Sequence, residues 1–229
     1  MFVYRTQRFF WPAHRKTPTE ETDRISLVPP VLPAARHVRP KRTLMDTPLK
    51  HLAVIGAGAM GSGIAALFAS KGLNIVLIDP MAGALERARS TIERQLNVYA
   101  PGQVQETLQR IRMEADLSAA VGSDLIIEAV PENLELKRSL FAKLDALCPP
   151  QAIFATNTSG LSINAIASAV TRRDRFVGTH FFTPADVIPL VEVVRNDDTS
   201  EDTVARVMAT LRFGGKRPVL VRQDIPGFI

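Results

Sequence analysis

The chain of 229 residues has little of what builds disulfide-rich, metal-rich or membrane proteins. It contains one cysteine, Cys148, which excludes an internal disulfide framework and any metal site made from several cysteines. No apolar run approaches the roughly 20 residues that a membrane-spanning helix needs, so we expect no membrane protein. With 46% hydrophobic and 22% charged residues, the composition is instead that of a globular protein with a sizeable core.

Excess charge is also absent from most of the chain. The net charge of +5 lies entirely within residues 1–48, which hold nine Lys and Arg against four Asp and Glu, together with seven of the sixteen prolines. Residues 49–229 hold nineteen of each sign. A basic globular domain of the kind that binds nucleic acid is therefore excluded, and we expect no nucleic-acid partner.

The Pro- and Arg-rich segment 1–48 shows no sustained strand or helix period. It cannot bury enough apolar surface to offset its ordering entropy, so we predict that it is disordered. Three interpretations stay open: a mitochondrial transit peptide, since residues 1–16 are basic and free of acid; a functional basic arm; or a reading frame extended upstream of a true start at Met45. We favour the last, which predicts a cytoplasmic protein, with the mitochondrial matrix as the alternative.

From Leu49 onward, short apolar runs alternate with segments of helical periodicity. Strands are predicted at 52–55, 74–78, 124–130, 152–155, 175–182, 190–194 and 218–221. Helices are predicted at 60–71, 82–98, 104–112, 134–147, 162–169 and 200–213. This alternation is typical of a parallel sheet covered by helices on both faces. The predicted fold class is α/β, a Rossmann-type doubly wound, mostly parallel sheet spanning residues 49–229.

The first strand leads into a glycine-rich turn. Gly56-Ala57-Gly58-Ala59-Met60-Gly61 fits G-x-G-x-x-G and stands between a strand and a helix, the context that the motif requires. The first glycine permits the tight turn, the second lets a pyrophosphate approach, and the third lets helix and strand pack closely. Asp79 ends the next strand, 23 residues after Gly56, where a carboxylate accepts hydrogen bonds from ribose and repels a 2′-phosphate. The sequence therefore predicts NAD as the cofactor, in preference to NADP.

Three polar residues near later strand ends are candidates for catalysis. Ser159 follows one strand, His180 lies near the end of the next, and Glu192 lies in the apolar run LVEVV. Oxidation of an alcohol by NAD needs a base, for which histidine is suited near neutral pH when a carboxylate fixes its tautomer. By itself, His180 between aromatic residues fits a core histidine equally well. Glu192 is the more informative residue, because a buried carboxylate needs a partner.

Several separate motifs carry a resemblance to a known family. VIGAGAMGSGIA, DLIIEAVPENLELK, FATNTSGLSI, VGTHFFTPADVIPLVEVV and DIPGFI together resemble the L-3-hydroxyacyl-CoA dehydrogenase family over residues 50–229. The resemblance implies NAD-dependent oxidation of an L-3-hydroxyacyl-CoA to the 3-oxoacyl-CoA, as in fatty acid metabolism. It implies His180 as general base, Glu192 as its orienting carboxylate and Ser159 on the substrate oxygen. The implied NAD contacts are Gly56, Ala57, Gly58, Ala59, Met60, Gly61, Asp79, Glu132, Lys137 and Ser159, and no metal is implied.

The sequence departs from the family pattern at three places. Gly160 stands where the family has the second serine of NTSSL, and Thr183 stands where it has the asparagine of HFFNP. Residues 95–102 carry no Lys or Arg, although the family places basic side chains there against the CoA phosphates. DVIPLVEVV and TSGL look more like the branch that acts on short polar 3-hydroxy acids such as carnitine or gulonate. An acyl-CoA and a short hydroxy acid both stay open as the small-molecule substrate.

The sequence ends at Ile229, inside the PGFI motif. In the family, a helical C-terminal domain begins there, supplies a catalytic asparagine, closes the acyl cleft and forms most of the dimer interface. Family members are dimers, but we expect the dimerising domain to be missing here. We expect this chain to bind NADH and to turn over substrate slowly, with a catalytically inactive NAD-binding fragment as the alternative.

Overall fold

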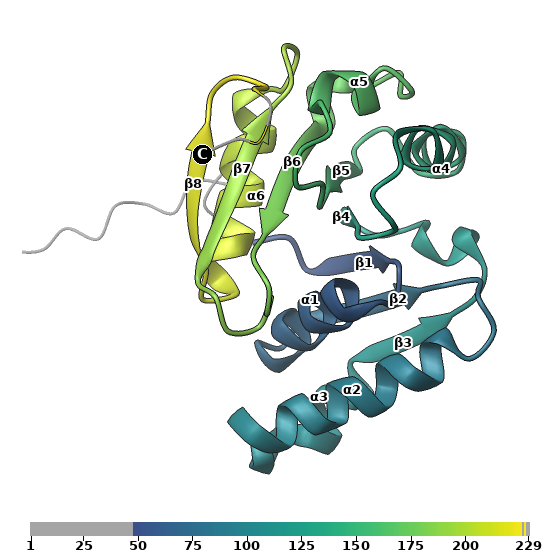
Figure 1. The fold of residues 1–229 in the computed structure, drawn as a ribbon, viewed down its shortest axis with the longest axis vertical. Coiled ribbons are helices and arrows are strands. Elements are labelled where there is room, and N and C mark those ends of the chain that lie inside the picture. The colour runs from purple at the N-terminus through teal and green to yellow at the C-terminus, as the bar shows by residue number, and fades with distance from the viewer. Residues whose placement is uncertain (1–47, 226, 228–229) are drawn as a thin grey trace, which may run out of the picture. The chain divides into compact units, whose positions relative to one another are not determined.

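The computed structural model describes residues 48–225 and 227, so the predictions for the first 47 residues lie outside the described part of the chain. Eight strands form one sheet in the order β3-β2-β1-β4-β5-β6-β7-β8 (Figure 1). Neighbouring strands pair in parallel except β6 and β7, which are antiparallel. The strands are β1 (His51–Ile55), β2 (Asn74–Ile78), β3 (Ile111–Glu114), β4 (Leu125–Glu128), β5 (Ile153–Thr156), β6 (Phe176–Phe181), β7 (Leu190–Arg195) and β8 (Arg217–Val221). The predicted doubly wound, mostly parallel sheet is confirmed.

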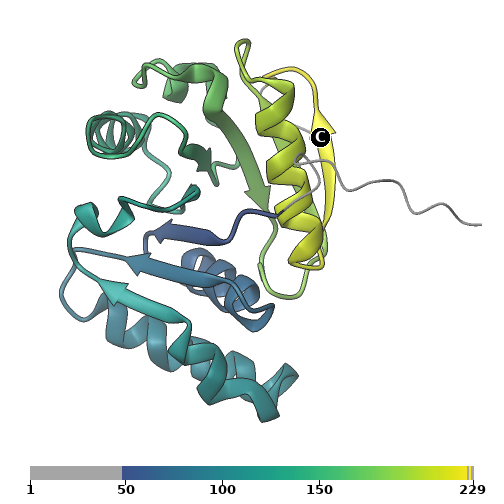
Figure 2. The same cartoon turned by 180° about the vertical axis from the view of Figure 1, so that it is seen from behind.

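Helices cover both faces of this sheet. The α-helices are α1 (Ala59–Ser70), α2 (Ala84–Tyr99), α3 (Val104–Gln109), α4 (Leu134–Leu147), α5 (Ile163–Ala167) and α6 (Glu201–Phe213). Short 3₁₀ turns lie at η2 (Pro101–Gln103), η3 (Leu117–Ala120) and η4 (Arg173–Arg175). Buried residues of α1, α2, α3 and α6 belong to one core cluster, and those of α4 and α5 belong to the other. Figure 2 shows α6 lying across the last strands of the sheet.

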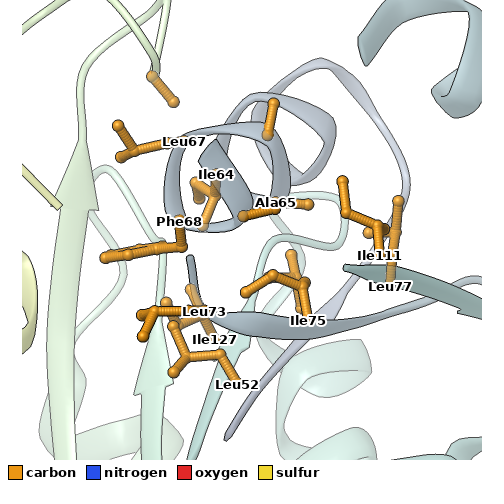
Figure 3. Packing of buried hydrophobic residues seen from close by; sticks show 14 of the residues in the cluster. Leu52, Ile64, Ala65, Leu67, Phe68, Leu73, Ile75, Leu77, Ile111 and Ile127 are labelled. Atoms are coloured by element: carbon orange, nitrogen blue, oxygen red, sulfur yellow. The ribbon is translucent and has the colours of Figure 1, made fainter. Parts of the chain in front are cut away.

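Successive side chains of each strand point to opposite faces of the sheet, so the apolar residues of one strand contribute to both cores. In β1, Leu52 and Val54 face the first core, whereas Ala53 and Ile55 face the second. Helix α1 lies centrally on the first face and contributes Ile64 to its packing (Figure 3). Nine of the twelve residues of α1 are buried, so the helix is packed firmly onto this face of the sheet.

One predicted element was wrong in its second half. The helix expected at 104–112 ends at Gln109, and β3 begins at Ile111, opposite Ile75 of β2. β3 is a four-residue edge strand with only its first residue buried, so it carries neither the apolar run nor the alternation that identifies a strand. Among residues 48–225, no helix is long and apolar enough to cross a membrane.

Candidate cofactor and catalytic site

The glycine-rich turn 56–61 joins β1 to α1 in a conformation that requires glycine. Gly56 has φ of 100°, and a Cβ on it would lie 2.6 Å from the carbonyl oxygen of Ala129. A Cβ on Gly61 would lie 1.8 Å from the carbonyl oxygen of Gly56. A Cβ on Gly58, in contrast, would meet no described atom within 4 Å. The turn is therefore packed tightly against the protein at Gly56 and Gly61, whereas the space beside Gly58 is free for a ligand.

The start of α1 is suited to an anion. No described side chain caps this helix terminus, and no acidic residue lies in its first turn. Backbone N–H groups at such a terminus, with the helix dipole behind them, favour phosphate groups. A pyrophosphate therefore fits the residues that are present.

Asp79 lies just beyond β2, beside this turn. Its Oδ2 accepts a hydrogen bond from the backbone N–H of Ala57 at 2.8 Å, and its Oδ1 accepts one from Met81 at 2.9 Å. The two bonds fix the orientation of the carboxylate, and each oxygen keeps a second lone pair for a ligand hydroxyl.

Two adjoining cavities extend from the turn. The first, of about 640 Å³, is lined by residues 55–60, Asp79 and residues 129–131 among others, and lies within the usual size of ligand sites. The second, of about 420 Å³, is lined by parts of β1, β2, η3 and α4. Both cavities share Ile55, Pro80, Val130 and Leu136, so together they form an extended site that suits an elongated dinucleotide.

A buried ion pair lies at the end of β4. Glu128 and Lys137 have no exposed side-chain surface, and Lys137 Nζ lies 2.6 Å from Glu128 Oε1. Glu128 also accepts hydrogen bonds from Thr156 Oγ1 at 2.5 Å and from the backbone N–H of Val130 at 2.7 Å. Burial raises the pKa of Glu128, while the Lys137 ammonium and these hydrogen bonds oppose the rise. Lys137 thus lies in the interior, beneath the wall of the site.

The same ammonium reaches a second carboxylate that is closer to solvent. Glu132 Oε2 lies 3.4 Å from Lys137 Nζ, and Glu132 Oε1 accepts hydrogen bonds from Thr158 Oγ1 at 2.5 Å and from the backbone N–H of Ser159 at 2.9 Å. Burial raises the pKa of Glu132, but the two hydrogen bonds and Lys137 outweigh it and hold that pKa below its ordinary value. Glu132 therefore stays ionised and fixes the backbone of exposed Ser159.

The two residues proposed as base and orienting carboxylate lie directly opposite each other. His180 of β6 pairs in register with Glu192 of β7, and His180 Nδ1 lies 2.6 Å from Glu192 Oε2. Glu192 is 1% exposed and His180 is 15% exposed. The Glu192 carboxylate is thus buried, whereas the His180 imidazole is partly exposed to solvent.

Asn157 links the segment that carries Ser159 to the strand that carries His180. Its Oδ1 accepts a hydrogen bond from the backbone N–H of Phe181 at 2.9 Å. The carboxyl ends of parallel strands lie at one edge of a sheet, and helices switch faces there between β1 and β4. The structure therefore brings the glycine turn, Asp79, Ser159 and His180 to one edge.

Sequence reasoning missed Glu128 and the two threonines at 156 and 158. Glu128 interrupts the apolar run DLIIEAV, which is the same signal that singled out Glu192. A carboxylate in a buried strand demands a cation or several donors, and Glu128 has both. The threonines carry no comparable signal, because Thr156 at the end of β5 and Thr158 in the loop after it are ordinary residues for a strand and a loop.

Known proteins resemble this chain over the same region. The human mitochondrial hydroxyacyl-coenzyme A dehydrogenase is 40% identical over 193 residues, which cover 79% of this chain and 61% of that protein. The 5-formyl-3-hydroxy-2-methylpyridine 4-carboxylate 5-dehydrogenase of Mesorhizobium japonicum is 36% identical over 185 residues, 79% of this chain and 60% of that one. The crystal structure of 3-hydroxybutyryl-CoA dehydrogenase from Escherichia coli matches with a TM-score of 0.77 and 41% identity, over 80% of this chain and 40% of that one.

The chain spans about three fifths of the length of the human relative. The family model of the 3-hydroxyacyl-CoA dehydrogenase NAD-binding domain matches residues 51–225, from the start of β1 to four residues beyond the end of β8. The predicted resemblance and the predicted cofactor class are confirmed by this match. The chain therefore belongs to the 3-hydroxyacyl-CoA dehydrogenase family and contains its NAD-binding domain.

Proposed function

We propose that this protein is an NAD-dependent oxidoreductase that interconverts an L-3-hydroxyacyl-CoA and the 3-oxoacyl-CoA. The observation that carries the proposal is the short contact between His180 and buried Glu192, next to the segment that bears Ser159. A module that only bound a dinucleotide would gain nothing from a buried carboxylate behind a partly exposed imidazole. The human relative is named a hydroxyacyl-coenzyme A dehydrogenase and the Escherichia coli relative a 3-hydroxybutyryl-CoA dehydrogenase, which agrees with this assignment.

The turn 56–61 and the start of α1 are proposed to hold the cofactor pyrophosphate, and Asp79 the ribose hydroxyls. Glu132 and Ser159 are proposed to face the nicotinamide half. Lys137 is proposed to serve this site through Glu132, since its own side chain has no exposed surface. When bound, NAD supplies the acceptor or donor of a hydride at its nicotinamide ring.

His180 is proposed to move the proton of the substrate hydroxyl. With Nδ1 committed to Glu192, proton exchange with substrate falls to Nε2. Glu192 holds the imidazole in the tautomer with the proton on Nδ1 and stabilises its positive charge after the proton arrives. Ser159 Oγ is proposed to donate a hydrogen bond to the substrate oxygen, so that oxygen, base and cofactor are held in one geometry.

The cofactor assignment is tested by titrating the purified chain with NADH and NADPH. We expect NADH to bind at least about tenfold more tightly, because the Asp79 carboxylate repels a 2′-phosphate. The Asp79→Ala variant should lose this discrimination, whereas Asp197→Ala, which changes an exposed carboxylate that lines neither cavity, should keep it. Equal affinity for both nucleotides in the unchanged chain would contradict the assignment.

The reaction is tested by single-turnover oxidation of NADH with acetoacetyl-CoA. We expect slow but measurable turnover, and His180→Asn should lower it at least about a hundredfold, the usual contribution of a general base. Glu192→Gln should lower it as well, while both variants keep NADH affinity. Turnover that is absent in the unchanged chain, with NADH binding intact, would support the catalytically inactive fragment instead.

A short polar 3-hydroxy acid is the second candidate substrate. Gly160, Thr183 and the lack of basic residues in 95–102 all remove features that the family uses for an acyl-CoA. The Mesorhizobium japonicum relative is named for a pyridine carboxylate rather than for a CoA ester, which agrees with a broader substrate range. Faster turnover of dehydrocarnitine than of acetoacetyl-CoA would favour this candidate.

Three further proposals concern the domain, the cellular location and the oligomeric state of the protein. We propose a domain from residue 49 onward that carries the site, a cytoplasmic location with the mitochondrial matrix as the alternative, and no dimer through this domain alone. Imaging of the full chain fused to a fluorescent protein distinguishes the two compartments. Sedimentation of the purified chain checks the oligomeric state, and a stable dimer would contradict the third proposal.

A further inference from the structure

A buried lysine outside the site contacts the loop that follows the base. Lys216 lies between α6 and β8, is 5% exposed, and donates hydrogen bonds from Nζ to the carbonyl oxygens of Ala185 at 2.5 Å and Ile188 at 2.8 Å. Burial lowers the pKa of Lys216, and the neighbouring Asp186 carboxylate opposes this. A buried ammonium is costly unless its N–H groups are satisfied, and here two of them are used on one loop.

That loop, residues 182–189, joins the strand of His180 to the strand of Glu192. Its opening half touches the cofactor helix: Thr183 Oγ1 donates to Met60 Sδ at 3.1 Å, and a Cβ on Gly63 would lie 3.3 Å from Ala185 Cβ. The loop therefore spans the gap between the phosphate-binding turn and the base. Lys216, in the turn between α6 and β8, contacts the same loop through the carbonyl oxygens of Ala185 and Ile188.

Packing alone does not account for a lysine at this position. A methionine has a similar length, would fill the same volume, and would avoid the cost of burying a charge. Lysine differs from it in holding two carbonyl groups three residues apart at fixed positions. A lysine at this position can therefore restrain the conformation of loop 182–189, which a methionine cannot do.

We propose that Lys216 is a positioning residue that holds loop 182–189 against α1 and thereby fixes the distance between the cofactor turn and His180. This role rests on the proposed function for its catalytic consequence, but its structural half can be measured independently. The local bonds of the loop are convenient reporters, because the N–H groups of Val187 and Ile188 both donate to the carbonyl oxygen of Pro184.

The test compares Lys216→Met with Lys50→Met, a matched change at an exposed lysine, in the full chain. In Lys216→Met, amide hydrogen exchange at Val187 and Ile188 should accelerate at least about tenfold, while amides of β1 keep their protection, as expected of a local opening. Single-turnover oxidation of NADH with acetoacetyl-CoA should fall about a hundredfold with NADH affinity within about twofold, the split expected when reacting groups are misplaced by about 1 Å.

Unchanged exchange at both loop amides would overturn the proposal, and so would turnover equal to that of Lys50→Met. Equal acceleration of exchange in β1 would overturn it too, because that result describes global destabilisation. If Lys216→Met does not fold, Lys216→Gln, which keeps one donor group, is measured against the same criteria. If the unchanged chain binds no NADH or shows no turnover, the proposed function fails and the turnover comparison does not apply, yet the exchange measurement still decides whether Lys216 holds the loop.

Discussion

Removing Lys137 is expected to be far more damaging than removing both members of its buried pair. At 2.6 Å, the charges of Lys137 and Glu128 attract each other by about 6 kcal/mol at an effective dielectric constant of about 20. Taking two ions out of water costs several kcal/mol for each, so the pair as a whole contributes little net stability. Lys137→Met deletes the attraction but leaves the Glu128 carboxylate enclosed in the protein.

We expect Lys137→Met to lower the free energy of unfolding by about 3–5 kcal/mol, the usual cost of an uncompensated buried charge. Glu128→Gln should cost less, because Lys137 keeps the Val130 carbonyl and Glu132 as partners. The double variant should cost less than Lys137→Met alone, and at least about 2 kcal/mol less than the sum of the two single variants, because the two charges contact each other.

The cost of Lys137→Met should also depend on pH. Burial already raises the pKa of Glu128, and loss of the Lys137 ammonium should raise it further. A carboxyl whose pKa is higher in the folded than in the unfolded protein stabilises the fold at low pH, and this stability is lost as pH rises through the folded pKa. The Lys137→Met variant should therefore lose less stability at pH 5 than at pH 8, whereas the double variant, with glutamine at 128, should not show this trend.

The assay is urea unfolding followed by circular dichroism at both pH values for the unchanged chain, the two single variants and the double variant. Lys143→Met, at a lysine of the same helix α4 that lies in neither ion pair within the described chain, is the control. Single-variant costs that add within about 0.5 kcal/mol would refute the reasoning, because they would mean that the two charges are uncoupled.

Three further outcomes follow from other parts of the fold. Gly61→Ala should weaken NADH binding at least about tenfold because its Cβ has no room, while Gly102→Ala, where a Cβ is unobstructed, should leave binding unchanged; fluorescence titration measures both. Phe141→Ala should lower the free energy of unfolding by about 3–5 kcal/mol in urea, since this fully buried ring contacts two other rings. Burial, with the Asp186 charge, raises the pKa of Tyr99 to about 12, so stability from Tyr99 should be lost between about pH 10 and 12, and Asp186→Asn should lower the ultraviolet titration midpoint.

The sequence predicted most of the fold because its central strands are buried on both faces and read as apolar runs. β3 escaped prediction for the opposite reason: as an edge strand with one buried residue, it has no pattern of its own. The antiparallel direction of β7 was not specified either, since loop 182–189 is too long for a tight hairpin and contains no helical period. Direct pairing of His180 with Glu192 depends on that direction and on register, which only the structure supplies.

The residues of the site also fall into two groups, those that the sequence indicates and those that only the structure reveals. The glycines were predictable because the tight turn leaves no room for a side chain at Gly56 and Gly61. The role of Asp79 at the ribose stays a prediction. Lys137 and Lys216 show what sequence alone leaves out. Lys137 in the amphipathic helix α4 and Lys216 in the turn before β8 both look like solvated charges, yet each is buried in the described structure. Which lysine is enclosed depends on packing between distant segments, and no local period records it.

The proposed base and the turn that is proposed to hold the cofactor belong to one sheet. His180 and Glu192 lie on adjacent strands of one sheet, and the cofactor turn grows from the same sheet. The orientation of His180, the proposed base, is therefore set by contacts within residues 48–225. If NADH binds normally and turnover is slow, the deficit lies in substrate enclosure and exclusion of water rather than in the base. Turnover should then rise with substrate concentration without saturating, whereas a defective base would lower the rate at saturating substrate.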